Sequence, residues 1–150
     1  MNIQVIFTRE NEPDFVSKAI MARDKADFSH VLILYRDHDR KLKVFHAVGA
    51  GVGVYCPKEF FQDHIKVHSF DVKLRVSRDY FYGYIRGSKG KDYAESQIAA
   101  IAVGQEADND DEKMICSELV GLVLTEMCGV PIEGDQDTWC PSHCFKALSL

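Results

Sequence analysis

Two short apolar runs, at residues 31–35 and 44–48, constrain the fold of this chain more than any other feature. Each run is apolar on both of its faces, and a polar segment at residues 36–43 separates them. Such runs are typical of strands that are buried on both sides, and the short polar connection predicts a β-hairpin. Residues 2–7 predict another strand, and apolar residues alternate with charged ones at 70–76. We therefore expect a mostly antiparallel sheet.

Helical patterns surround these predicted strands. Proline-led segments predict an amphipathic helix at 13–22, a helical turn at 57–61 and a short helix that begins at Pro141-Ser142. The second half is mostly helical, with predicted helices at 77–86, 92–103 and 115–127. Gly49, Gly51 and Gly53 are expected to break the chain before residue 54, and the acidic run 106–112 is expected to be a solvated loop. The pattern indicates an α+β fold in which helices pack against an antiparallel sheet.

Length and charge exclude several classes of protein. A chain of 150 residues is long enough for one domain with a sizeable core, so we expect a single domain over 1–150. The net charge of -5, without a basic stripe, argues against nucleic acid as a partner. No apolar run approaches the roughly 20 residues that span a bilayer. An odd number of cysteines and the lack of a signal-like leader favour a cytoplasmic location. The oligomeric state stays open.

Two histidines interrupt the apolar strands. His30 begins the first run and His46 lies within the second, and an imidazole in such a strand is costly unless it has a partner. A hairpin centred on His38 would place His30 directly opposite His46, on the same face of the sheet. One ring could then act as a base while the other fixes its tautomer, whereas a slip of one residue would separate them. Each histidine taken singly is also compatible with an ordinary core position.

Cys116 lies in the first turn of a predicted helix. Unpaired backbone N–H groups and the positive end of the helix dipole stabilise a thiolate there, which is how a cysteine becomes a nucleophile. The alternative is that Cys116 is one more buried structural thiol, because free cysteine is among the most buried residue types. The two histidines favour the catalytic interpretation.

The order of these motifs resembles the circularly permuted branch of the NlpC-type papain-like cysteine hydrolase superfamily. The motifs are Ser29-His30-Val31, Val44-Phe45-His46-Ala47, a glycine-rich turn into Gly53-Val54, and Ile115-Cys116-Ser117-Glu118-Leu119-Val120. This branch contains the YiiX-like bacterial and phage hydrolases and the lecithin:retinol acyltransferase-like enzymes. The resemblance implies a papain-like fold with Cys116 as nucleophile, His30 as general base and acid, and His46 as the orienting third member. YiiX-like members commonly have an acidic residue at the His46 position, whereas the acyltransferase branch has a second histidine.

The implied activity is thiol-dependent hydrolysis of an amide or ester, as in a peptidase, amidase or esterase, through a thioester intermediate. Suggested substrates are peptidoglycan-like cell-wall peptides, isopeptide-type bonds and lipid acyl groups. Acyl transfer by the same triad is one alternative, and a catalytically inactive binding module is another. The backbone N–H of Cys116 could donate to the oxyanion, and Thr8, Ser29 and Ser117 are further candidates for contact with the oxyanion or substrate.

No cofactor or metal is expected. Cys128, Cys140, His143 and Cys144 carry the soft ligands that zinc prefers, but their spacing lacks the paired C-x-x-C pattern of structural sites. His64 and His68 alternate with apolar residues and are expected on the solvated face of their segment. The aromatic residues at 80–84 fit either a substrate cleft or ordinary core.

Overall fold

The computed structural model describes residues 1–48, 51–88, 92–93, 113–114 and 116–150. A five-stranded sheet in the order β4-β3-β2-β1-β5 forms the centre of the fold, and every neighbouring pair in it is antiparallel. Its strands are β1 (Asn2–Glu10), β2 (His30–Arg36), β3 (Leu42–Val48), β4 (Gly51–Tyr55) and β5 (His64–Lys73). The described helices are α1 (Phe15–Asp24), α2 (Pro57–Phe60), α3 (Arg78–Ser88), α5 (Cys116–Met127), the 3-10 turn η1 (Gln136–Thr138) and α6 (Pro141–Leu148). The expected α+β class is confirmed.

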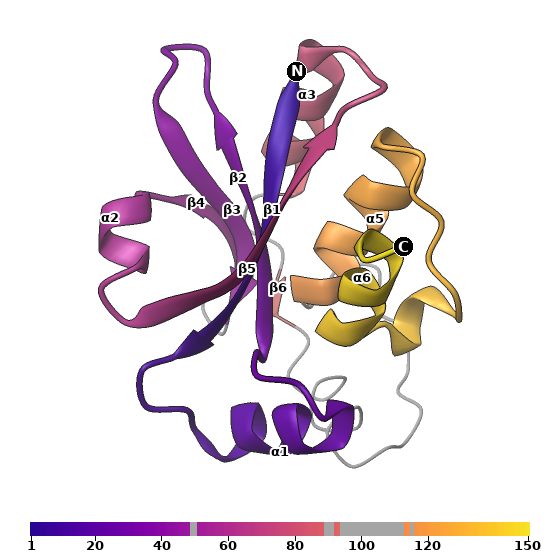
Figure 1. The fold of residues 1–150 in the computed structure, drawn as a ribbon. Helices are drawn as coiled ribbons and strands as arrows, with labels where there is room; N and C mark the ends of the chain where they lie inside the picture. Colours follow the sequence, from indigo (N-terminus) through magenta and orange to yellow (C-terminus); the bar gives the residue numbers. More distant parts are fainter. Residues whose placement is uncertain (49–50, 89–91, 94–112, 115) are drawn as a thin grey trace.

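Both faces of the sheet are covered, which explains why β2 and β3 are apolar throughout. Figure 1 shows α5 and α6 on one side of the sheet and α2 on the other. Side chains alternate between the two faces along a strand. Val31 and Ile33 therefore pack with α5, whereas Leu32 packs with Phe60 of α2. This alternation decides which residues of the candidate site can meet.

The predicted hairpin is confirmed, but its register differs from the expected one. Ile33 pairs with Phe45, which centres the turn on Asp39 rather than on His38. The turn is held by hydrogen bonds across it, since the backbone N–H of Asp37 donates to Lys41 and that of Arg40 donates to Asp37. His30 is therefore displaced along the hairpin from His46 instead of lying directly opposite it. The displacement is an even number of residues, so both histidines still share a face.

Two other local predictions were wrong. Gly51 and Gly53 do not break the chain but lie within β4, where the backbone pairs with β3 whatever the side chain. A Cβ at Gly53 would come within 3.0 Å of the Tyr55 ring, so that position suits glycine. Residues 92–93 form β6 (Asp92–Tyr93), which pairs in parallel with β7 (Lys113–Met114), instead of beginning a helix. The rest of that predicted helix and the acidic run 106–112 lie outside the described residues.

The helix that carries the candidate nucleophile is confirmed. α5 begins at Cys116, and its core face includes Leu119, Val123 and Met127, all buried. Just past its end, Gly129 has a φ of 68°, the left-handed conformation in which glycine commonly follows a helix. α5 packs against β2 and β3, and its first residue, Cys116, is hydrogen-bonded to the backbone of Val31 in β2.

Candidate functional site

The structure brings two of the predicted site residues together. His30, the first residue of β2, and His46, within β3, approach each other with a distance of 3.0 Å between His30 Nε2 and His46 Nδ1. Both rings also contact the ring of Phe60 from α2. They lie on the sheet face whose small buried cluster consists of Ile6, Leu32, Val44 and Phe60. The predicted pairing of the imidazoles is therefore present, in an apolar setting.

A third imidazole borders this pair, although the sequence had suggested a solvated position for it. His64 stacks on Phe60 at a centroid distance of 4.1 Å, and its Nδ1 donates to the carbonyl oxygen of Phe60, four residues earlier. Its ring centroid is 6.3 Å from that of His30. His64 follows Phe60, the last residue of the proline-led turn at 57–60, by four residues. This spacing is the sequence signal that could have placed His64 near the pair.

Burial keeps the paired histidines neutral. Desolvation is the largest cause that lowers the pKa of His46 to about 4, and the neighbouring His64 adds to it. The pKa of His30 is well below 6.5 for the same reason, with smaller contributions from His46 and His64. Two neutral imidazoles can share one hydrogen bond, in which one ring donates and the other accepts. At neutral pH the ring that donates this hydrogen bond therefore keeps a lone pair on its other nitrogen that can accept a proton, whereas the lone pair of the accepting ring is engaged.

Cys116 is the first residue of α5, as expected, but its thiol is not activated. Burial raises its pKa to about 11, which outweighs the backbone hydrogen bonds from Val31 and Ser117 that act in the opposite direction. The expectation that the helix start would stabilise a thiolate is wrong, because the side chain is only 4% exposed and desolvation disfavours its charged form. At rest the group is a neutral thiol.

Cys116 and the rings of the histidine pair belong to different sides of the sheet. Cys116 packs in the large core cluster with Val31 and Phe45, on the α5 side of the sheet. The rings of His30 and His46 lie on the α2 side. The side chains of consecutive residues in β2 point to opposite faces of the sheet. The sulfur of Cys116 is hydrogen-bonded to the backbone of Val31, which follows His30, whereas the ring of His30 points to the other face. The catalytic roles of these residues stay predictions.

The three residues proposed for oxyanion or substrate contact have different positions. Thr8 pairs with His30 across β1 and β2, and its buried Oγ1 has no hydrogen-bond partner among the described residues. Ser29 is buried, and its backbone N–H donates to the carbonyl of Thr8. Ser117 donates its hydroxyl to the carbonyl of Trp139 at 2.7 Å, which ties α5 to the segment before α6. Thr8 is therefore the one of the three whose side chain is buried beside the histidines with an unused donor.

A thiol and an imidazole do meet elsewhere, at the start of α6. Cys140 Sγ lies 2.9 Å from His143 Nδ1, and the same nitrogen accepts the backbone N–H of Cys140. This N-terminal capping arrangement accounts for the contact structurally. In the sequence, Cys140 and His143 form a C-x-x-H spacing, which had been considered only as part of a possible zinc site. Burial raises the pKa of Cys140, so this thiol is also neutral.

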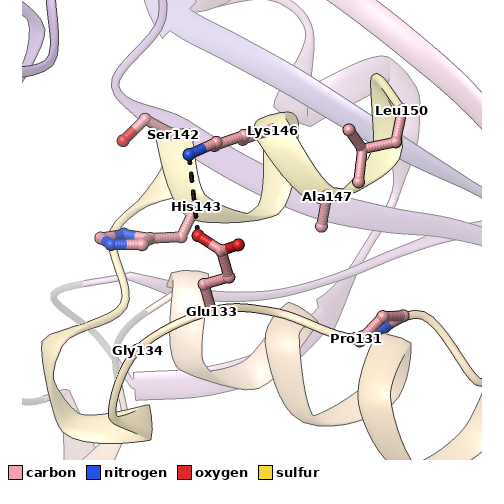
Figure 2. A pocket seen from close by; sticks show the side chains of 8 residues that line it. All are labelled: Pro131, Glu133, Gly134, Ser142, His143, Lys146, Ala147 and Leu150. Carbon is pink, nitrogen blue, oxygen red and sulfur yellow. Dashed lines mark ion pairs between the residues drawn. The ribbon is translucent and has the colours of Figure 1, made fainter.

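A cavity of about 590 Å³ adjoins His143. Figure 2 shows that Ser142, His143 and Lys146 reach it from α6, while Glu133 reaches it from the preceding segment. Lys146 Nζ and Glu133 Oε2 form an exposed ion pair across it at 3.7 Å. Because these charges neutralise each other and Cys140 is 2% exposed, the cavity does not open onto a reactive group.

The residues considered for zinc do not assemble into a metal site. Cys128 ends up beside Arg75 just past the end of α5, and Cys144 donates to the carbonyl of Ser117. In the described part of the chain, no three cysteine, histidine, aspartate or glutamate side chains are arranged to hold a metal ion. None of the described helices is long and apolar enough to cross a membrane.

Comparisons with known proteins bear on the fold. No family model matches the chain, and no curated protein matches its sequence. The structure is similar to the crystal structure of the metalloprotein YiiX from Escherichia coli O157:H7, DUF1105, with a TM-score of 0.63 and 21% sequence identity. The match covers 87% of this chain and 68% of the YiiX chain. The α+β fold with its antiparallel sheet is thus a YiiX-like one.

Proposed function

We propose that this protein is a thiol-dependent hydrolase in which Cys116 is the nucleophile, His30 the general base and His46 the group that orients it. The contact of 3.0 Å between His30 Nε2 and His46 Nδ1 carries the proposal. In the tautomer in which His30 donates this hydrogen bond, its Nδ1 has the lone pair that accepts a proton. A base held in one tautomer by a second buried group is what nucleophilic catalysis by a thiol needs.

The position of Cys116 supports the second part of the proposal. Its sulfur is hydrogen-bonded to the backbone of Val31, the residue that follows His30. His30 is the terminal residue of β2, so the reaction requires the thiol to reach His30 Nδ1 around this strand end. The YiiX-like fold is compatible with this proposal. The roles of Cys116 and His30 come from the resemblance of the sequence motifs.

The chemistry follows from the neutral resting state. The proton moves from Cys116 Sγ to His30 Nδ1 while the sulfur attacks the substrate carbonyl carbon, and the backbone N–H of Cys116 can donate to the oxyanion. Collapse expels an amine or alcohol that takes the proton from His30 and leaves a thioester. Water, activated by the same base, then hydrolyses the thioester and frees the thiol.

Two other functions have specific support. Acyl transfer from the same thioester to an acceptor is favoured by His46, which stands where hydrolases of the resembling branch have an acidic residue. A catalytically inactive binding module is favoured by the placement of Cys116 and the histidine rings on opposite faces of the sheet.

A metal-dependent activity is not supported by the residues of this chain. YiiX is named a metalloprotein. His30, His46 and His64 are neighbouring imidazoles in this chain, but they are not arranged to hold a metal ion. His30 and His46 instead share a hydrogen bond, so the nitrogens that face each other are 3.0 Å apart with no room for an ion between them. We derive no step through a metal.

Acyl-enzyme trapping tests the proposal. The protein is incubated with p-nitrophenyl acetate, and the labelled residue is identified by peptide mass spectrometry. We expect an acetyl group on Cys116, slower acetylation in His30→Gln, and release of the group by water. Cys56→Ala is the matched control, because Cys56 is exposed whereas the other four cysteines are buried. Persistence of the acetyl group until an amine is added would favour acyl transfer, whereas labelling of Cys56 without Cys116 would contradict both activities.

A further inference from the structure

A second cavity lies at the other end of the sheet from the histidine pair. Its volume is about 730 Å³, which is within the usual range for small-molecule sites. It is lined by the start of β1, the end of β2, the start of β3, and residues from β5 and α3. His30 and Arg36 are the first and last residues of β2, so this cavity is separate from the candidate catalytic site.

Three arginines from three different parts of the chain line this cavity. Arg36 ends β2, Arg40 is in the β2–β3 turn, and Arg78 begins α3. In the part of the chain that the structure describes, none of the three pairs with a carboxylate. Arg78 also occupies the first turn of an 11-residue helix, where the dipole disfavours a cation and favours an anion. With Asp37 and Asp71 also in the lining, the three arginines leave the cavity with an excess of one positive charge, on a chain whose net charge is -5.

The two carboxylates that line the cavity are engaged elsewhere. Asp37 Oδ1 accepts the backbone N–H groups of Asp39 and Lys41, at 2.9 and 3.0 Å. Asp71 Oδ1 accepts the side-chain amide of Gln4 at 3.1 Å. These hydrogen bonds fix one oxygen of each carboxylate. Both carboxylates keep their negative charge, and neither forms an ion pair with an arginine of the cavity in the described part of the chain.

Hydrogen bonds also fix the backbone that carries the arginines. Tyr82 of α3 donates its hydroxyl to the carbonyl of Arg36 at 2.8 Å, which ties the helix to the end of β2. Arg36 Nη1 donates to the carbonyl of Arg40 at 2.9 Å, and Arg40 has a φ of 62°, a conformation that non-glycine residues seldom adopt. A site whose backbone is already ordered loses less entropy when a ligand binds.

We propose that this cavity binds a small soluble ligand that carries one or more phosphoryl groups. Guanidinium groups match phosphoryl oxygens in charge and in their paired hydrogen-bond geometry, and three of them can contact several such oxygens at once. Leu34, Leu42 and the ring of Tyr82 line the same cavity and provide apolar contact for the rest of the ligand. An anionic lipid headgroup has the same chemistry and is distinguished by experiment.

Isothermal titration calorimetry with inorganic pyrophosphate at low salt tests the proposal on the full chain. We expect saturable binding that weakens about tenfold or more in Arg40→Gly and in Arg78→Gln, since each removes a charge-assisted contact. Arg40→Gly preserves the turn, because glycine adopts a positive φ freely. Arg86→Gln is the matched control, as it removes an exposed guanidinium from the same helix outside the cavity. Thermal unfolding checks that each variant is folded.

Three outcomes would overturn the proposal. One is the absence of saturable pyrophosphate binding by the unaltered protein. Another is equal weakening in Arg86→Gln, which would indicate attraction by overall charge instead of a built site. The last is co-sedimentation with vesicles that contain an anionic phospholipid, but not with neutral ones, in a protein that does not bind pyrophosphate. That result would assign the arginines to a lipid surface.

Discussion

Acid should destabilise this protein through its buried imidazole pair. The pKa of His46 is about 4 in the folded chain, against 6.5 for an ordinary histidine, and the side chain is 3% exposed. Because the folded pKa is the lower one, the unfolded chain binds the proton first as the pH falls. The contribution of His46 to stability is complete above pH 6.5 and is lost as the pH falls toward 4. With about 1.36 kcal/mol per unit, this shift amounts to roughly 3 kcal/mol.

Urea unfolding at pH 7 and near pH 4 measures this loss. Trp139 is the single tryptophan and is buried, so its fluorescence reports unfolding. The unaltered protein should lose more stability between the two pH values than His46→Asn, by about 3 kcal/mol, because asparagine can occupy the hydrogen-bonding position without titrating. His38→Asn is the control, since it makes the same substitution at an exposed histidine in the β2–β3 turn. Equal losses in the unaltered protein and in His46→Asn would refute the reasoning.

Other predictions follow from single contacts. Iodoacetamide should alkylate Cys116 more slowly than exposed Cys56 at neutral pH, and the rate of alkylation of Cys116 should rise with pH up to about 11. Fast labelling of Cys116 near pH 7 would contradict the raised pKa of its thiol. Gly121→Ala should destabilise the fold by about 1–3 kcal/mol in urea unfolding, because the new Cβ would lie 2.5 Å from the buried Trp139 ring. Asp14→Ala should cost about 1 kcal/mol, since Asp14 Oδ1 caps α1 by accepting the N–H of Ser17 at 2.8 Å; an unchanged denaturation midpoint would show that the cap is not formed.

The sequence could not show on which side of the sheet Cys116 packs, and this has a physical cause. The runs that form β2 and β3 are apolar on both faces, so they show no alternation that tells which face α5 covers and which α2 covers. Spacing correctly predicted that His30 and His46 share a face, because an even displacement in a hairpin conserves it. It could not show that the face would be the one opposite Cys116.

The raised pKa of Cys116 was missed for a related reason. The start of a helix is a local feature, whereas desolvation depends on every element packed around the side chain. The contact of Cys140 with His143 is local in the sequence. Whether this thiol can react depends on burial as well, and Cys140 is almost inaccessible in the folded chain.

The sequence by itself therefore determined the main elements and their class: the hairpin, the half-buried strand, the helix that begins at Cys116 and the short helix after Pro141. These depend on periodicity, proline and glycine positions, which act over a few residues. Only the tertiary structure decided which groups meet, how deeply each is buried and where charges gather. It brought His64 beside the histidine pair and separated Cys116 from it. It also gathered Arg36, Arg40 and Arg78 around one cavity, because packing in space joins residues whose spacing in the chain carries no such signal.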